Sequence, residues 1–216
     1  MHRETLSDLL SLLLIAAVFV ALLCWWRLPR PCPRLLQRAG LLIGVALVLE
    51  VTGLVLRVQG AQNNMLYNGF LVFEFGMMLW LIATAEQGLQ RPAALAGLVG
   101  VAGFVWSIME QGGLHLLSTN AILIFCLLLA PLLVRLLYLQ AQQSQLPLTR
   151  LGSFWFFLGS FLYFVGLVPL IGAVRLVYAH DRELAASLWL VIPVLAILRY
   201  AFYARACSLG PPALKP

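Results

Sequence analysis

Two carboxylates lie inside long apolar stretches of this 216-residue chain. Glu50 stands late in the stretch 38–57, and Glu74 stands near the middle of the stretch 65–86. A charged side chain at the centre of a bilayer costs at least ~2.5–3.5 kcal/mol on insertion scales, so an ionisable residue there indicates a function. If the two helices are antiparallel neighbours, the two residues differ in depth by roughly one turn. Close together, they would form an acid/base pair in which one carboxyl keeps its proton.

Polar side chains continue along one side of the segment that carries Glu74. From Asn63 the spacing to Tyr67, Phe70 and Glu74 is +4, +7 and +11, which is one face of a helix. The sequence therefore predicts a ligand-binding pocket, lined by Asn63, Asn64, Tyr67, Asn68, Glu74 and Glu50. The alternative interpretation is that these groups only join helices, through interhelical hydrogen bonds worth ~0.6 kcal/mol on average.

Seven stretches of ~20 mostly apolar residues are long enough to position these side chains inside a bilayer. They cover residues 6–27, 38–57, 65–86, 92–110, 118–140, 151–174 and 184–204. The breaks between them are short and rich in turn-forming residues. We therefore predict an all-α fold in which residues 1–216 form one seven-helix transmembrane domain, with no soluble domain.

The composition excludes several classes of protein. Hydrophobic residues make up 62% of the chain and charged residues 10%, and the mean hydropathy is +0.97. Soluble domains have ~45–50% apolar and ~25% charged residues. We therefore exclude a water-soluble enzyme, a nucleic-acid-binding module and a disordered adaptor, and we expect membrane lipids as the surroundings.

The basic residues predict how the chain is oriented. The net charge is +6, and the arginines stand singly at the ends of apolar stretches, most densely in the segment 27–38. The positive-inside rule places this segment in the cytoplasm, the N-terminus outside and the C-terminus inside. The polar face that carries Asn63, Tyr67 and Glu74, which we call the polar stripe, then opens toward the outer side. Arg135 and Arg199 are expected to extend their head groups to the inner surface.

Small residues and prolines predict how the helices pack. Gly152, Gly159 and Gly166 recur at every seventh position, which is typical of a close helix–helix contact. Pro131, Pro169 and Pro193 fall inside the last three stretches and should bend them. Bent helices can act as hinges, as a sensory switch requires.

We expect no cofactor and no metal. The four cysteines Cys24, Cys32, Cys126 and Cys207 form no CxxC or Cys/His cluster, so neither a disulfide nor a structural zinc is predicted. No lysine lies in any span, which excludes a retinal Schiff base. No span carries the paired histidines of a typical heme site. Nucleophile-elbow, HExxH and phosphate-loop motifs are absent from the sequence.

Several short motifs resemble a pattern in uncharacterised small seven-helix integral membrane proteins of Bacteroidota-type bacteria. That pattern has an acid late in the second helix, like Glu50, and then an Asn-Asn…Leu-Tyr segment and a Glu-Phe pair, like residues 63–67 and 74–75. Phe154-Trp155…Gly159…Leu162-Tyr163 and Trp189 also resemble it. The resemblance implies the seven-helix architecture and highlights Glu50 and Glu74, and it brings no established activity. We expect the protein to lie in a bacterial inner membrane. The chain departs from the pattern at Asn68, where a His would follow the Tyr.

Four functions are compatible with these features. The leading interpretation is a receptor-like bundle that binds a small apolar or amphipathic ligand from the outer side and acts through a protein partner. The alternatives are an intramembrane lipid-modifying enzyme or a proton-coupled transporter that uses Glu50 and Glu74, and a structural subunit of a membrane complex. Enzyme activity is thus an alternative and not the leading expectation. The apolar segment 77–81 would close a transport path on the inner side.

Overall fold

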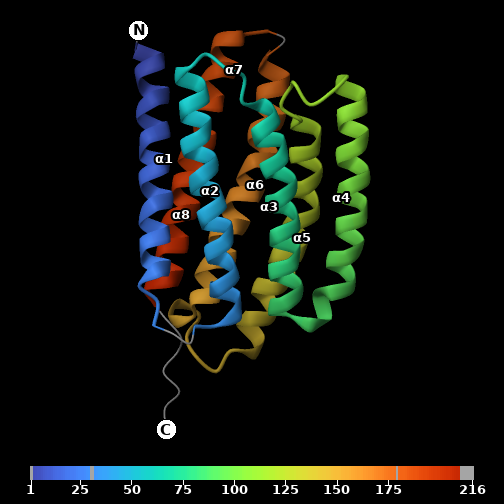
Figure 1. Ribbon diagram of the computed structural model, residues 1–216. Helices are drawn as coiled ribbons and strands as arrows, with labels where there is room; N and C mark the ends of the chain where they lie inside the picture. The colour runs from blue at the N-terminus through green and yellow to red at the C-terminus, as the bar shows by residue number, and fades with distance from the viewer. Residues whose placement is uncertain (1, 30–31, 179, 210–216) are drawn as a thin grey trace.

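The computed structural model describes residues 2–29, 32–178 and 180–209, and they form an all-α bundle (Figure 1). Two short 3₁₀ helices, η1 (Gln87–Leu89) and η2 (Leu148–Arg150), connect longer elements. The α-helices are α1 (His2–Trp26), α2 (Arg34–Val58), α3 (Asn64–Ala85), α4 (Gln90–Gln111), α5 (Thr119–Gln143), α6 (Gly152–Tyr178), α7 (Arg182–Trp189) and α8 (Val191–Ser208).

Among the described residues, seven helical segments are long and apolar enough to cross a membrane, when α7 and α8 are counted together as the last of them. The predicted all-α class and the number of apolar segments are therefore confirmed. Successive segments run in opposite directions, so α1 begins and α8 ends at opposite ends of the bundle (Figure 1). The architecture is that of a multi-pass membrane protein.

The last segment is interrupted where the sequence predicted one continuous span. α7 ends at Trp189 and α8 begins at Val191, and the amide of Leu190 donates to the carbonyl of Ser187 at 3.1 Å. Pro193 has no N–H, so the carbonyl of Trp189 loses the hydrogen bond that a continuous helix would give it. The prolines of α5 and α6, by contrast, lie within helices that continue past them.

The helices enclose a central space. α1 packs against α2 and α8, α8 against α6, and α6 against α5, while α3 closes the ring between α2 and α5. α4 lies outside this ring and packs on α3 and α5, as Figure 1 shows at the edge of the bundle. The ring places the face of α3 that carries Glu74 opposite α6 and α8.

The seven-residue glycine repeat of α6 forms the contact with α8. A Cβ added at Gly152 would lie 2.7 Å from the carbonyl oxygen of Ala206, and one at Gly159 would lie 2.6 Å from the Cβ of Phe202. A Cβ at Gly166 would lie 3.1 Å from Cδ1 of Leu195. The repeat thus lets two backbones approach closely, which confirms the predicted packing role.

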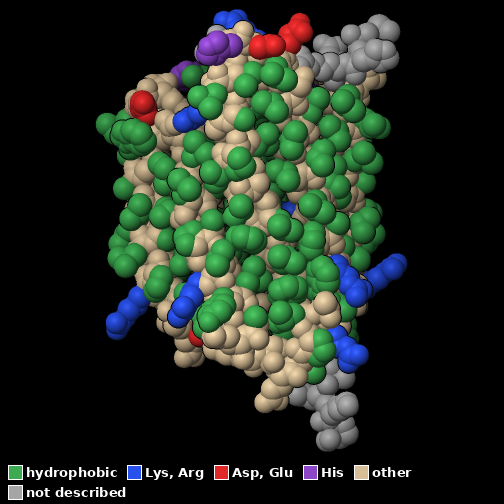
Figure 2. Space-filling model, turned by 180° about the vertical axis from the view of Figure 1, so that it is seen from behind, with side chains coloured by type: hydrophobic (Ala, Val, Ile, Leu, Met, Phe, Trp, Pro, Cys, Tyr) green, Lys and Arg blue, Asp and Glu red, His purple; other side chains and the backbone are tan. Residues whose placement is uncertain are grey.

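The outer surface has an apolar belt with charges at its two ends. Figure 2 shows hydrophobic side chains around the middle of the bundle and charged side chains above and below them. The belt includes strongly exposed residues of α4 such as Leu98 (71%) and Met109 (76%). The end where α1 and α8 finish carries the arginines Arg27, Arg34, Arg38, Arg91, Arg150 and Arg205.

Candidate functional site

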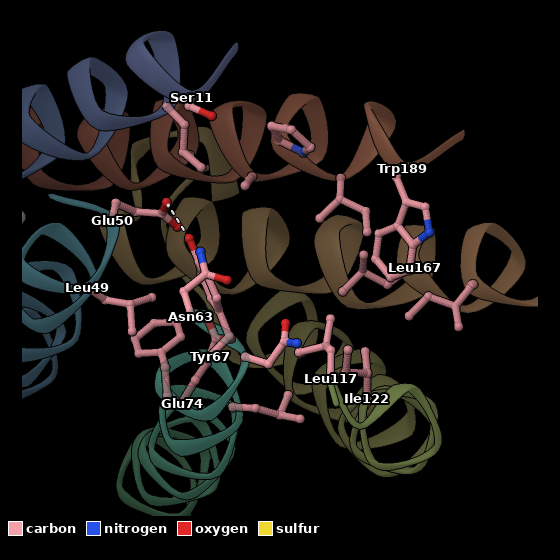
Figure 3. Close-up of a pocket in the computed structure, with 18 of the residues that line it drawn as sticks. Ser11, Leu49, Glu50, Asn63, Tyr67, Glu74, Leu117, Ile122, Leu167 and Trp189 are labelled. Atoms are coloured by element: carbon pink, nitrogen blue, oxygen red, sulfur yellow. Dashed lines mark hydrogen bonds between the residues drawn. The ribbon is translucent and has the colours of Figure 1, made fainter. Parts of the chain in front are cut away.

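A cavity of about 870 Å³ lies inside the ring of helices (Figure 3). It extends from the exposed loop between α2 and α3, at Gly60 and Ala61, down to Glu74 on α3. Every ring helix and α7 contribute to its wall, whereas no described residue of α4 does. Its volume falls within the ~300–1,000 Å³ that is typical of small-molecule sites.

Glu50 projects from α2 toward Tyr67 on α3. The phenol of Tyr67 donates to the Oε2 of Glu50 at 3.5 Å, which is the dashed contact in Figure 3. The two helices can approach here because Gly53 has no side chain, and a Cβ at that position would lie 2.7 Å from the Tyr67 hydroxyl. This separation is longer than the roughly 2.5–3.0 Å of ordinary hydrogen bonds between two oxygens. Glu50 is therefore held only weakly by its neighbour.

Glu74 forms a buried ion pair with Arg199 of α8. The Oε1 of Glu74 contacts the Nη1 of Arg199, and the two residues are only 5% and 2% exposed. Glu74 still contributes to the floor of the cavity. The two carboxylates thus line one cavity, as the sequence suggested, but in different states of pairing, because Glu74 has a cation beside it.

Arg199 is surrounded by aromatic rings and hydroxyl groups. Its Nε donates to the hydroxyl of Tyr203 at 2.7 Å, and that hydroxyl lies 2.8 Å from the Oγ of Ser160 on α6. Its guanidinium carbon lies 4.7 Å from the ring centre of Tyr163 and 5.0 Å from that of Tyr203. Cations are attracted to ring faces at such distances. The network ties α3, α6 and α8 together beneath the cavity.

The position of Arg199 corrects the sequence prediction that its side chain extends to the inner surface. The apolar stretch was expected to end at residue 204, but α8 continues to Ser208. Nine residues then separate Arg199 from the helix end, about 13 Å of rise, which is too deep for the head group to reach water easily. The i, i+4 spacing of Arg199 and Tyr203 was the available signal for a buried polar face.

The mouth of the cavity carries the remaining polar groups. Arg57 donates to the Oγ of Ser11 at 3.0 Å and lies 3.9 Å from the carboxylate of Asp8 on α1. Asn63 and Asn64 line the same rim, and the amide of Asn64 also donates to the carbonyl of His115 at 2.9 Å. The predicted stripe residues Asn63, Asn64, Tyr67 and Glu74, together with Glu50, therefore surround one cavity.

Asn68 does not line this cavity, contrary to its place in the predicted site. Its side chain is fully buried, and its amide donates to the carbonyls of Leu114 and Leu116 at 3.2 and 2.8 Å. Its Oδ1 accepts from the amide of Ser118 at 3.0 Å. These three hydrogen bonds hold the α4–α5 loop against α3. One residue further along a helix is a turn of 100°, so Asn68 faces away from Tyr67.

The cavity ends near the middle of α3. Beyond Glu74 the helix buries Met77, Met78 and Leu81, and none of these contributes to the cavity. Phe75 stacks on Phe125 of α5, with ring centres 4.0 Å apart. The space is therefore a pocket that ends at Glu74 above a packed apolar layer, rather than a path through the bundle.

Comparisons of the chain with protein-family models, with curated protein sequences and with solved structures found no match. The site must therefore be interpreted from its own chemistry. Within the part of the chain that the structure describes, no three His, Cys, Asp or Glu side chains are grouped to hold a metal ion. What the arrangement offers is an apolar pocket with two acidic groups on its wall and floor.

Proposed function

We propose that this protein binds a small apolar or amphipathic molecule inside a membrane-spanning bundle. The observation that carries the proposal is the cavity itself, because about 870 Å³ of space in contact with Glu50, Tyr67 and Glu74 exceeds what helix packing requires. Protein interiors are close-packed and contain few voids larger than a water molecule. A role in helix packing alone would not explain so large a space.

The distribution of charge supports the proposed orientation. The arginine-rich end of the bundle, where α1 and α8 finish, would lie in the cytoplasm by the positive-inside rule. The mouth of the cavity at Gly60 and Asn63 lies at the opposite end, so the ligand would enter from the outer leaflet or the periplasmic side. We propose a bacterial inner membrane as the location, in line with the resemblance of the sequence.

The interruption of the last span between α7 and α8 favours a sensory role for the binding site. Trp189, Leu190 and Pro193 stand at the junction of α7 and α8, and all three line the cavity. A ligand would therefore touch the one discontinuous span among the described segments. A junction of this kind can absorb a change of angle between two helices, which a partner protein could detect.

The pairing of Glu74 favours binding over acid/base catalysis by two carboxylates. General acid/base chemistry needs one protonated and one ionised group, each free to exchange a proton with the substrate. Glu74 already has Arg199 as its counter-ion, so its carboxylate is engaged within the protein and is not free to act on a substrate.

Native mass spectrometry of the gently solubilised protein tests the proposal. We expect a stoichiometric small molecule or lipid to co-purify with the wild type and to be lost in Ala186→Trp, which fills the mouth of the cavity from α7. The matched control is Ala94→Trp, since Ala94 is also exposed and lies on α4 outside the cavity. Equal occupancy in both variants, or only bulk lipid on the wild type, would contradict a role for this cavity.

A further inference from the structure

The charged groups around the cavity are unequally partnered. Arg57 lies beside Asp8 and Ser11 at the mouth, and Arg199 neutralises Glu74 at the floor. Among the described charged residues that line the cavity, Glu50 is the one without an ion-pair partner. Its one side-chain partner there is the Tyr67 hydroxyl at 3.5 Å, and no described cation lies within 4.0 Å of its carboxylate.

A carboxylate that stays ionised inside a bilayer needs a partner of opposite charge. Ionised groups in membrane spans almost always pair, because the membrane interior solvates them poorly. The hydroxyl of Tyr67 supplies a single long hydrogen bond, whereas a carboxylate can accept about four. The charge and the unused acceptor sites of Glu50 both face a space large enough for a ligand.

The rest of the wall suits the body of an organic cation. Aromatic side chains, including Tyr67, Phe70 and Trp189, line the cavity, and ring faces attract cations. The opposite wall in Figure 3 carries Leu167 and Ile122. An anion at the level of Glu50 would lie beside a carboxylate, and Arg199 is already paired with Glu74, so this part of the cavity disfavours negatively charged ligands.

We propose that the occupant of the cavity is an amphipathic molecule with an ammonium group, which binds Glu50 and the Tyr67 hydroxyl. This inference rests on the proposed binding function and narrows its ligand class. The same chemistry is offered by a free hydrophobic amine and by the ammonium headgroup of phosphatidylethanolamine. The bilayer itself supplies the lipid headgroup, whereas a free amine must enter the cavity from solution or from the membrane.

Calorimetric titration of the full chain in lipid nanodiscs, with empty nanodiscs subtracted, tests the ligand class. The probes are octylamine and octan-1-ol, which share a chain and differ in the charge of the head group. In nanodiscs of phosphatidylglycerol we expect octylamine to bind at least about tenfold more tightly than octanol, as a charge-assisted hydrogen bond implies. Glu50→Gln should remove this preference and leave the affinity for octanol within about twofold.

Glu110→Gln is the control, because Glu110 is exposed, lies near the same end of the bundle and does not line the cavity. It should preserve the preference for octylamine. If adding phosphatidylethanolamine to the nanodiscs weakens octylamine binding, the headgroup competes for the site, and if it does not, a free amine is the ligand. Both results support a cation.

Two outcomes separate the claims. Equal affinity for octylamine and octanol, unchanged in Glu50→Gln, would overturn the assignment of a cation while leaving a binding cavity. Saturable binding of neither probe, together with no bound molecule on the native protein, would overturn the binding function itself.

Discussion

Replacing Arg199 by Met examines the buried ion pair that forms the floor of the cavity. Met keeps much of the length and apolar area of the side chain but removes its charge. Arg199 is 2% exposed and Glu74 5% exposed, so the change leaves a carboxylate without its cation in a poorly solvating environment. Breaking one side of a buried pair costs about 3–5 kcal/mol. We expect Arg199→Met to lower the free energy of unfolding by about that amount.

A double-mutant cycle isolates the interaction from the loss of packing. Glu74→Gln alone should also destabilise the protein, since it leaves the Arg199 charge buried. The double variant should recover part of the loss, with a coupling energy of about 2–3 kcal/mol. Reversible unfolding in mixed micelles, followed by tryptophan fluorescence, measures all four proteins.

The matched control is Arg57→Met at the mouth of the cavity. Its ion pair with Asp8 is long, at 3.9 Å, and its side chain is 43% exposed. Exposed pairs contribute about 0–1 kcal/mol. If Arg199→Met costs no more than this control and shows no coupling to Glu74, the guanidinium lies at the membrane surface, and the account of the floor is wrong.

Four further substitutions, one of them a control, test the packing around the site by the same unfolding measurement. Gly159→Ala should lower the free energy of unfolding by about 1–3 kcal/mol, because the new Cβ would lie 2.6 Å from the Cβ of Phe202. Gly172→Ala is the control and should be neutral or slightly stabilising, because its new Cβ meets nothing within 4 Å. Equal effects of the two substitutions would contradict the close α6–α8 contact. Gly53→Ala should destabilise by a similar 1–3 kcal/mol and displace the Tyr67 hydroxyl, which lies 2.7 Å from the added Cβ, and no loss of stability would refute that approach. Asn68→Leu should lower the free energy of unfolding by about 2 kcal/mol or more and speed amide exchange at residues 114–118, because it removes three hydrogen bonds to the loop. Unchanged exchange would show that other contacts hold the loop.

Hydropathy predicted the helices well because a bilayer imposes a fixed length of apolar residues on each span. It predicted their ends less well. α5 and α6 continue to Gln143 and Tyr178, beyond the apolar stretches that ended at 140 and 174. Backbone hydrogen bonding continues where the apolar run stops, because polar and charged residues are also good helix formers at a membrane surface.

Helical periodicity predicted which residues of α3 share a face. Tyr67 and Glu74 do line one cavity, as their spacing required. Asn68 was included because it is polar, although its position differs from that of Tyr67 by 100°. Its true partner is the loop 114–118, and no local pattern in α3 reveals where a loop 46 residues away will fold.

The partner of Glu74 was missed for a different reason. An arginine near the expected end of a span is normally a surface residue, and the location of Arg199 depends on four more residues of helix at the C-terminal end. The pairing of α3 with α8 is a property of the closed ring of helices. A single sequence predicts the depth of a residue in the membrane and the face of the helix on which it lies. It does not predict which helices are neighbours.

If the cavity between the helices is open at its mouth, polar reagents should reach it at the level of Tyr67 and Leu71. Cysteine labelling in nanodiscs tests it most directly, with the four native cysteines replaced by serine or alanine. Leu71→Cys lies in the cavity wall, and Leu98→Cys lies on the exposed apolar face of α4. The account predicts that a charged methanethiosulfonate reagent modifies Leu71→Cys, more slowly when Ala186→Trp is added, and leaves Leu98→Cys unmodified. Equal inertness of both cysteines would contradict it.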